Sequence, residues 1–259
     1  EGYLACGTIG PGRMSAIEEI VAAVEEELRR RTAQSDAQSD LAGETVLITA
    51  GPTREPLDPV RYLSNRSSGR MGFALAEEAL ARGARVILIA GPTALPPPAR
   101  AEVVRIETAE QMRAAVLEHL AESTIIIKAA AVADFRPARR APRKIKKSAA
   151  PPAIELEPTP DILAELGRRK GGRLLVGFAA ETENLREEAA RKLKAKNCDL
   201  VVGNLVGQPG AGFDAEENEA ILVTAQETIE LPRSSKRELA ARLFDHIHKL
   251  HRARPMVRP

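Results

Sequence analysis

The sequence predicts an α/β protein built on a doubly wound, mostly parallel sheet with helices on both faces. Short runs of β-branched and other apolar residues alternate along the chain with segments whose apolar residues recur at helical spacing. The runs are almost continuously apolar, which is typical of parallel strands covered on both faces. Strands that alternate with helices indicate crossover connections between parallel strands.

Each element follows from its local sequence. Thr159 before Pro160 is typical of an N-cap followed by proline at the first helical position, and Ser235 with Glu238 is typical of a capping box. We expect strands over residues 45–50, 86–90, 124–127, 174–178, 200–203 and 221–224. We expect helices over about 70–82, 109–121, 160–169, 184–196 and 235–250. This order of elements indicates a Rossmann-like fold.

The first 31 residues differ in character from the rest of the chain. Ser15 and Glu18 match a capping box, and the apolar residues after them recur at helical spacing, which predicts one amphipathic helix. A single helix cannot bury its apolar stripe alone, so we expect its partner to be a domain that this chain lacks. Residues 32–42, with the doubled tetrad AQSD, are interpreted as a linker. Residues 43–251 form the predicted main domain, and residues 252–259 a tail.

Composition excludes several classes of protein. Of the 259 residues, 44% are hydrophobic and 29% are charged, which argues against disorder because a core can form. No apolar run approaches the ~20 residues of a membrane span. A net charge of +2 and 3% aromatic residues argue against a nucleic-acid partner. Two cysteines are too few for a disulfide framework, so we expect a cytoplasmic protein.

Two segments that follow predicted strands are candidate ligand sites. Ser67, Ser68 and Gly69 come directly before a helix, whose N-terminus attracts anions; alternatively, these residues only cap and pack the helix. Small residues and then Asp134 follow the strand at 124–127, where Asp134 can hold a metal or accept hydrogen bonds. The alternative for Asp134 is a turn cap.

Basic residues gather in two further places. Seven arginines and lysines lie between residues 136 and 147, as a solvated run or as a loop that closes over polyphosphate. Lys192 and Lys196 are i,i+4 neighbours whose charges repel unless an anion bridges them, although lysines near a helix C-terminus also complement its dipole. The four histidines show no metal-ligand spacing.

Six stretches together resemble the phosphopantothenate–cysteine ligase domain of bacterial bifunctional coenzyme A biosynthesis proteins. The resemblance runs from about residue 43 to 250. The stretches are GPTREPLDPVRYLSNRSSGRMGFALAEEALARGA (51–84), AAAVADFRP (129–137), KIKK (144–147), PDIL (160–163), VGFAAET (176–182) and GAGFDAEENE (210–219).

The resemblance implies a reaction in two steps. The carboxylate of 4′-phosphopantothenate attacks the α-phosphate of CTP and releases pyrophosphate. The amine of L-cysteine then displaces CMP from the acyl-cytidylate to form the amide. Cationic side chains and Mg²⁺ offset the charge on the phosphates. The family resemblance also implies a homodimer in which the phosphopantothenate site is completed across the interface.

The resemblance assigns roles to individual residues. Lys144 is implied to form the acyl-cytidylate, Asn65 to hold it for attack by cysteine, and Asp134 to lie near the metal. Ser67, Ser68 and Gly69 are implied to face phosphate. The implied CTP site comprises these three together with Lys128, Ala129, Ala130, Asp134, Lys144, Pro160, Asp161, Ile162, Leu163, Phe178, Lys192 and Lys196.

This chain departs from the family pattern at three positions. Lys128 stands where a small or apolar residue is usual, Thr159 replaces an asparagine, and Leu205 replaces an aspartate. None of these departures changes Lys144 or Asn65.

The first segment resembles the end of the flavin-dependent decarboxylase domain that precedes the ligase in such fusions. Cys6 matches its active-site cysteine. The FMN-binding body is expected to lie before Glu1, so we expect decarboxylation only in a full-length fusion. The alternative hypothesis for the whole chain is a non-catalytic nucleotide- or dinucleotide-binding regulatory module. The glycines at 69 and 72 do not match the spaced dinucleotide fingerprint.

Overall fold

The computed structural model describes residues 2–3, 9–10, 17–18, 20–25, 39–147, 153–181, 183–205 and 217–253. The chain divides into two compact units, residues 1–40 and residues 41–259. In the first unit, β1 (Gly2–Tyr3) pairs antiparallel with β2 (Ile9–Gly10), and residues 20–25 are helical. Cys6 and the predicted cap Ser15 lie outside the described residues.

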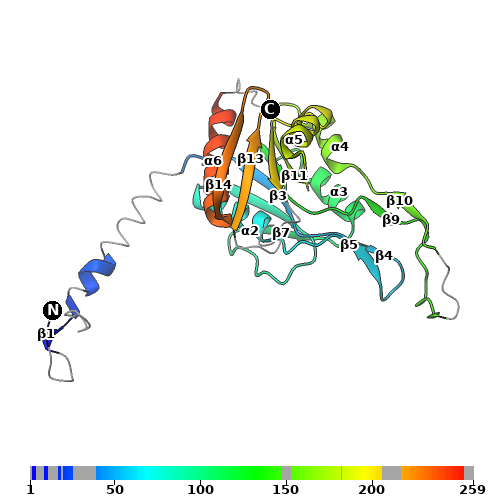
Figure 1. Ribbon diagram of the computed structural model, residues 1–259, viewed down its shortest axis with the longest axis horizontal. Helices are drawn as coiled ribbons and strands as arrows, with labels where there is room; N and C mark the ends of the chain where they lie inside the picture. Colours follow the sequence, from blue (N-terminus) through cyan, green and yellow to red (C-terminus); the bar gives the residue numbers. More distant parts are fainter. Residues whose placement is uncertain are drawn as a thin grey trace. The chain divides into compact units, whose positions relative to one another are not determined.

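The second unit is built on one eight-stranded sheet in the order β14-β13-β12-β11-β8-β3-β6-β7 (Figure 1). Six of these strands pair parallel with their neighbours: β3 (Thr45–Ala50), β6 (Arg85–Ala90), β7 (Glu102–Arg105), β8 (Ile125–Lys128), β11 (Leu174–Glu181) and β12 (Leu200–Leu205). Counted in chain order, they lie across the sheet as 3-2-1-4-5-6, which is the Rossmann order. The predicted fold class is confirmed.

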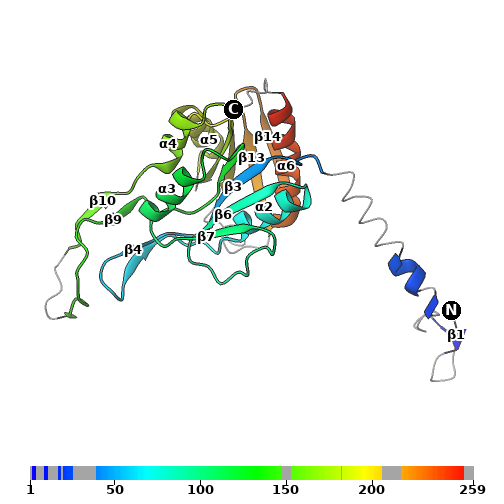
Figure 2. The same ribbon diagram turned by 180° about the vertical axis from the view of Figure 1, so that it is seen from behind.

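Helices cover both faces of this sheet (Figures 1 and 2). On one face, α2 (Arg70–Ala81) and α6 (Lys236–Arg252) pack on side chains such as Ile125 and Ile127. On the other, α3 (Ala109–Glu118), α4 (Ile162–Arg169) and α5 (Leu185–Ala195) pack on side chains such as Ile126. Because neighbouring strand residues enter opposite cores, the central strands must be apolar at every position.

All six expected strands occur, but the structure adds strands with weaker sequence signals. The expected strand at 221–224 is the end of β13 (Glu217–Val223), which runs antiparallel to β12 and pairs with β14 (Thr228–Ser235). β7 has four residues, and β14 contains a proline and charged residues, as edge strands often do. Two antiparallel pairs lie outside the main sheet: β4 (Arg54–Pro56) with β5 (Tyr62–Ser64), and β9 (Phe135–Pro137) with β10 (Leu156–Pro158).

Two predicted helix caps have different outcomes. Ser235 and Glu238 form the expected capping box at the start of α6. Thr159 is not the N-cap of α4, so that prediction is wrong. The N-cap is Asp161, whose carboxylate accepts a hydrogen bond of 2.9 Å from the Ala164 N–H. A carboxylate is a strong acceptor at a helix N-terminus, where the dipole also favours negative charge.

The second unit starts two residues before the predicted boundary. Leu41 is fully buried, and its N–H donates to the Arg82 carbonyl, which ties it to the end of α2. In the described parts of the chain, no helix combines the length and the apolarity needed to cross a bilayer.

Candidate nucleotide site

The strand order reverses between β3 and β8, and the loops at the carboxyl ends of these two strands meet there. The Ala131 N–H donates to the Gly51 carbonyl at 3.0 Å, and Pro52 forms a parallel bridge with Ala131. In open α/β sheets, ligands bind outside the carboxyl ends of the strands at such a reversal. The two loops that the sequence singled out are therefore neighbours at the expected edge of the sheet.

Two buried threonines hold the loop after β8 from one side. The Thr49 hydroxyl accepts from the Ala130 N–H at 3.2 Å, and the Thr53 hydroxyl accepts from the Ala133 N–H at 3.0 Å. Both threonines are fully buried. Because the loop's N–H groups are bound at fixed points, its backbone has little freedom to move.

Two further side chains hold the same loop at its end. The Asn65 amide donates to the Val132 carbonyl at 2.9 Å, and the Thr159 hydroxyl donates to the Ala133 carbonyl at 2.6 Å. The Thr159 N–H also donates to the Asp134 carbonyl. These bonds place Asn65 beside the segment that carries Asp134, and they explain why Thr159 is not available as a helix cap.

A cavity of about 520 Å³ opens beside this loop, at the carboxyl ends of β8 and β11 and against α4 and α5. This volume is in the range of small-molecule and cofactor sites. Ten predicted site residues line it, namely Lys128, Ala130, Asp134, Pro160, Asp161, Ile162, Leu163, Phe178, Lys192 and Lys196. Six further residues complete the lining: Val132, Ala133, Pro158, Thr159, Arg191 and Ala195.

 Of the ten predicted residues in this lining, Lys128 departs from the family pattern and the other nine match it. Ala129 does not line the cavity; it packs against the core under α2 and α6.

Three lysines lie in the lining of the cavity. Lys128, at the end of β8, is buried, and this burial lowers the pKa of its ammonium to about 7. Lys192 and Lys196 reach the cavity from α5, where they lie on the face that α5 turns toward it. Cations in a partly desolvated cavity are suited to bind phosphate, because a low local dielectric strengthens their attraction.

The two lysines of α5 each have a partner on the protein. The Lys196 ammonium forms an ion pair with Asp161, and the Lys192 ammonium donates to the Phe178 carbonyl at 3.2 Å and lies 3.9 Å from a Glu181 oxygen. A bridging anion is therefore not needed to let the two charges coexist. Triphosphate oxygens would instead compete with Asp161 for Lys196.

Asp134 is exposed at the edge of the cavity. Among the described residues, no group of three or more histidine, cysteine, aspartate or glutamate side chains could hold a metal ion by itself. Mg²⁺ needs no such cage when it is bound by one or two carboxylates together with substrate phosphates and water. Asp134 therefore fits an ion that arrives with a triphosphate.

The N-terminus of α2 lies next to the loop after β3, since a Cβ at Gly69 would be 3.3 Å from the α-carbon of Gly51. Gly69 is its N-cap with a φ of 79°, a conformation that favours glycine. The helix start has no side-chain cap hydrogen bond, but the Ser67 hydroxyl accepts a hydrogen bond of 3.3 Å from the Gly69 N–H. The residue types of Ser67 and Ser68 and the helix dipole remain suited to an anion. None of Ser67, Ser68 and Gly69 lines the cavity described above.

Lys144 also lies outside the cavity lining. Its side chain is exposed on the segment that follows β9. The next residue, Ile145, is hydrogen bonded through both its N–H and its carbonyl to Asp58 and Arg61, which lie between β4 and β5. The structure thus anchors the Lys144 segment on the β4–β5 pair rather than on the cavity wall.

Some lining residues were not expected from the sequence, and Arg191 is the most useful example. Arg191 and Ala195 are i,i+4 neighbours on α5, one position before Lys192 and Lys196. Ala195 lies three residues after Lys192 and four after Arg191, and these spacings place the residues on one side of the helix. That spacing is the signal that could have found them.

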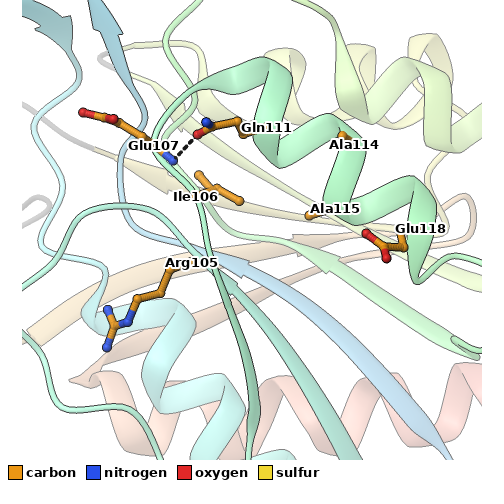
Figure 3. A pocket seen from close by; sticks show the side chains of 7 residues that line it. All are labelled: Arg105, Ile106, Glu107, Gln111, Ala114, Ala115 and Glu118. Carbon is orange, nitrogen blue, oxygen red and sulfur yellow. Dashed lines mark hydrogen bonds between the residues drawn. The ribbon is translucent and has the colours of Figure 1, made fainter.

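A second pocket lies between β7 and α3, lined by Arg105, Ile106, Glu107, Gln111, Ala114, Ala115 and Glu118 (Figure 3). The Glu107 N–H donates to the Gln111 side chain at 2.7 Å. Figure 3 shows the charged ends of Arg105 and Glu107 pointing away from α3. This pocket contains no predicted site residue and exposes two glutamates, so the lysine-lined cavity is the better candidate for an anionic ligand.

A Rossmann-like sheet with a lysine-lined cavity at the carboxyl ends of its strands defines an α/β domain that is suited to bind an anionic small molecule. Residues 41–250 match the family described as the DNA/pantothenate metabolism flavoprotein C-terminal domain, and the chain belongs to this family.

Known proteins agree with this assignment. The coenzyme A biosynthesis bifunctional protein CoaBC of Bacillus subtilis (strain 168) is 46% identical over 252 residues, which are 96% of this chain and 61% of that protein. CoaBC of Escherichia coli (strain K12) is 44% identical over 95% of this chain and 60% of its own length. The crystal structure of the C-terminal domain of a CoaBC protein is 42% identical, with a TM-score of 0.72, over 83% of this chain and 99% of that domain.

Proposed function

We propose that this chain ligates 4′-phosphopantothenate to L-cysteine at the expense of CTP, as a step of coenzyme A biosynthesis. The observation that carries the proposal is the cavity beside the loop after β8, in which Lys128, Lys192 and Lys196 meet Asp134. The CoaBC proteins of Bacillus subtilis and Escherichia coli are more than 40% identical to this chain over nearly its whole length. The chain spans about 61% of the length of the Bacillus protein.

The first step joins the phosphopantothenate carboxylate to the α-phosphorus of CTP, and the bond to the β-phosphate oxygen breaks to release pyrophosphate. Lys192 and Lys196 bind the triphosphate, and their charges offset the negative charge that builds on it. Lys144 donates hydrogen bonds to the phosphate oxygens at the reacting centre. Asp134 would hold Mg²⁺, which supplies further neutralisation of the phosphates when it is bound.

The second step joins the cysteine amine to the acyl carbon, and the bond to CMP breaks. The proton lost by the amine passes to solvent or to the departing phosphate. Asn65 holds the intermediate in this proposal, which is supported by the hydrogen bond that its amide donates to the carbonyl of Val132, a residue of the cavity lining. A fixed amide can orient the acyl group for attack, which is the contribution that proximity makes to such a step.

We also propose that the ligase domain forms a homodimer. Large apolar side chains are exposed on or directly beside the two antiparallel pairs outside the main sheet. Both pairs extend from the same side of the second unit in Figures 1 and 2. The exposed side chains are Val60, Tyr62, Phe135, Ile154 and Leu156. Several large apolar side chains exposed on one side of a domain are typical of an interaction site. A second copy would cover it.

The segment before the linker stays a proposal as well. We propose that residues 1–31 are the end of a decarboxylase domain whose FMN-binding body is not in this chain. Cys6 would serve that activity only in a full-length fusion. The ligase is proposed to act in the cytoplasm on small molecules, without nucleic acid or membrane.

The first prediction tests the ligase reaction directly. Incubating the chain with CTP, Mg²⁺, phosphopantothenate and cysteine should release pyrophosphate and CMP. Lys144→Gln should abolish pyrophosphate release, because the cation at the reacting phosphate is lost. Asn65→Asp should release pyrophosphate but accumulate the acyl-cytidylate, detectable by mass spectrometry.

The matched control is Lys194→Gln, because Lys194 is an exposed lysine of α5 that does not line the cavity. It should keep the activity of the unaltered protein. Absence of cysteine-dependent CMP release would refute the ligase. A larger thermal stabilisation by NADH than by CTP would favour the dinucleotide-binding module instead, since a ligand stabilises the fold to which it binds.

A further inference from the structure

Lys128 is a buried lysine in the wall of the candidate nucleotide cavity. Only 8% of the residue is exposed, although its side chain lines the cavity. In the described parts of the chain, its ammonium forms no hydrogen bond and no ion pair. Burying a charged group without such a partner costs free energy, because the protein does not replace the water that is removed. Folding alone therefore does not explain a lysine at this position.

The geometry of β8 directs this side chain toward the cavity. Side chains of a strand alternate between the two faces of the sheet. Ile125 and Ile127 enter the core under α2 and α6, and Ile126 enters the core under α3, α4 and α5. Lys128 is the second residue after Ile126, so its side chain leaves the strand on the same face. On that face α4 and α5 form the wall of the cavity.

The strands on either side of β8 do not neutralise the ammonium. Lys128 lies opposite Thr49 of β3 and Gly177 of β11. The Thr49 hydroxyl accepts from the Ala130 N–H, and Gly177 has no side chain. Neither neighbour carries a charge, so a compensating group has to come from the cavity.

The carboxylates at the cavity do not pair with Lys128 either. The Asp161 carboxylate accepts from the Ala164 N–H and pairs with Lys196. Asp134 is exposed at the edge of the cavity. The charged groups that line the cavity or pair with its lining are Asp134 after β8, Asp161 at the start of α4, Glu181 at the end of β11, and Arg191, Lys192 and Lys196 on α5. A bound anion would be a direct partner for the buried ammonium.

The empty cavity holds Lys128 close to its titration point. Burial lowers the pKa of its ammonium to about 7; the charges of Asp161 and Asp134 oppose this shift, and the charge of Lys192 adds to it. An anion beside the ammonium favours the charged form and raises this pKa. Above pH 7, binding of an anion therefore draws a proton onto the side chain.

We propose that Lys128 is a specificity-determining residue of the cavity: it binds an anionic oxygen of the ligand and takes up one proton from solvent as the ligand enters. The proton adds to the lone pair of Nζ, and it returns to solvent when the ligand leaves. The cavity thus favours a ligand that brings negative charge to the end of β8. That this ligand is CTP rests on the proposed ligase function.

Calorimetric titration with CTP at pH 8 tests the proton uptake. Mg²⁺ is kept equal in both solutions, and buffers of different ionisation enthalpy report the number of protons that are bound with CTP. Lys128→Met should take up about 0.9 proton fewer per CTP than the unaltered protein, because about a tenth of free Lys128 is charged at this pH. Protons that other groups exchange are common to both proteins and cancel. Lys194→Met is the matched control and should equal the unaltered protein, since Lys194 is exposed and does not line the cavity.

The pH dependence of the affinity is a second measurement. Between pH 8 and pH 9, the Kd for CTP should rise about tenfold more in the unaltered protein than in Lys128→Met, because only the unaltered protein must charge a lysine on binding. Lys128→Arg should also lose this dependence, since a guanidinium stays charged throughout. The arginine variant serves as the test if the methionine variant fails to fold.

Equal proton uptake in Lys128→Met and in the unaltered protein would overturn the role of Lys128, and so would an equal pH dependence of the Kd. Lack of CTP binding by the unaltered protein would instead refute the proposed ligase function. Inorganic pyrophosphate, titrated in the same way, then decides the question for Lys128. Absence of pyrophosphate binding as well would overturn the anion-binding role of the cavity.

Discussion

Lys128 is the residue whose setting is hardest to explain by packing alone. It ends β8 with its backbone paired between β3 and β11, and its side chain is buried in the wall of the cavity. Burial of an ammonium costs free energy unless a partner compensates, and here the charges of Asp161 and Asp134 offset this cost only in part. A residue that destabilises the empty fold is typical of a binding site.

The pKa of Lys128 makes this cost depend on pH. Its folded-state pKa of about 7 lies below the ordinary value of 10.5, so between these values only the unfolded chain holds the proton. The free energy of unfolding therefore rises with pH in this window. Lys128→Met should raise the Tm most below pH 7, and a gain of about 1 kcal/mol corresponds to about 2–4 °C.

Melting curves between pH 6 and pH 10 measure this effect. Lys194→Met is the control, because Lys194 is an exposed lysine of α5 and its loss should not change the pH dependence of the Tm. A Lys128→Met protein whose Tm parallels that of the unaltered chain at every pH would contradict the assignment of the penalty to Lys128.

Among the elements, α2 depends most closely on one small residue. A Cβ at Gly72 would lie 2.5 Å from the Cβ of Ala50, so the helix can approach β3 only because this residue has no side chain. Gly72 therefore sets the distance between the start of α2 and the loop after β3. The role of Gly72 is therefore close packing.

Gly72→Ala should destabilise the domain by about 1–3 kcal/mol, because the helix must move away from the strand. Urea unfolding measures the change. Glu77→Ala, an exposed position of the same helix, should stay within about 0.5 kcal/mol of the unaltered protein. Equal stability of the two variants would show that the helix and strand adjust without cost.

For the whole molecule, the exposed apolar side chains of β5, β9 and β10 predict self-association. Phe135→Asp places a charge in that surface and should convert a dimer to a monomer, as measured by analytical ultracentrifugation. Lys194→Gln, away from that surface, should stay dimeric. A chain that is monomeric without any substitution would contradict the proposed dimer.

The central strands and the helices between them could be predicted because each is encoded locally. Near-continuous apolar runs of residues such as Ile125, Ile126 and Ile127 leave few alternatives to a parallel strand covered on both faces. The cap of α4 could not be predicted in the same way. Thr159 and Asp161 are both good caps, and only the distant carbonyls of Ala133 and Asp134 decide that Thr159 bonds elsewhere.

By itself, the sequence determined the fold class and the order of the main elements, because residue type and periodicity fix which faces are buried. Its resemblance to the ligase family named ten of the residues that line the cavity. The tertiary structure decided what depends on partners far away in the chain. It paired Lys196 with Asp161, placed Asn65 against Val132, and joined Asp58 to Ile145 beside Lys144. Such hydrogen bonds and ion pairs require two groups to lie within about 3 Å of each other. Local sequence patterns do not encode contacts between segments that are distant in the chain.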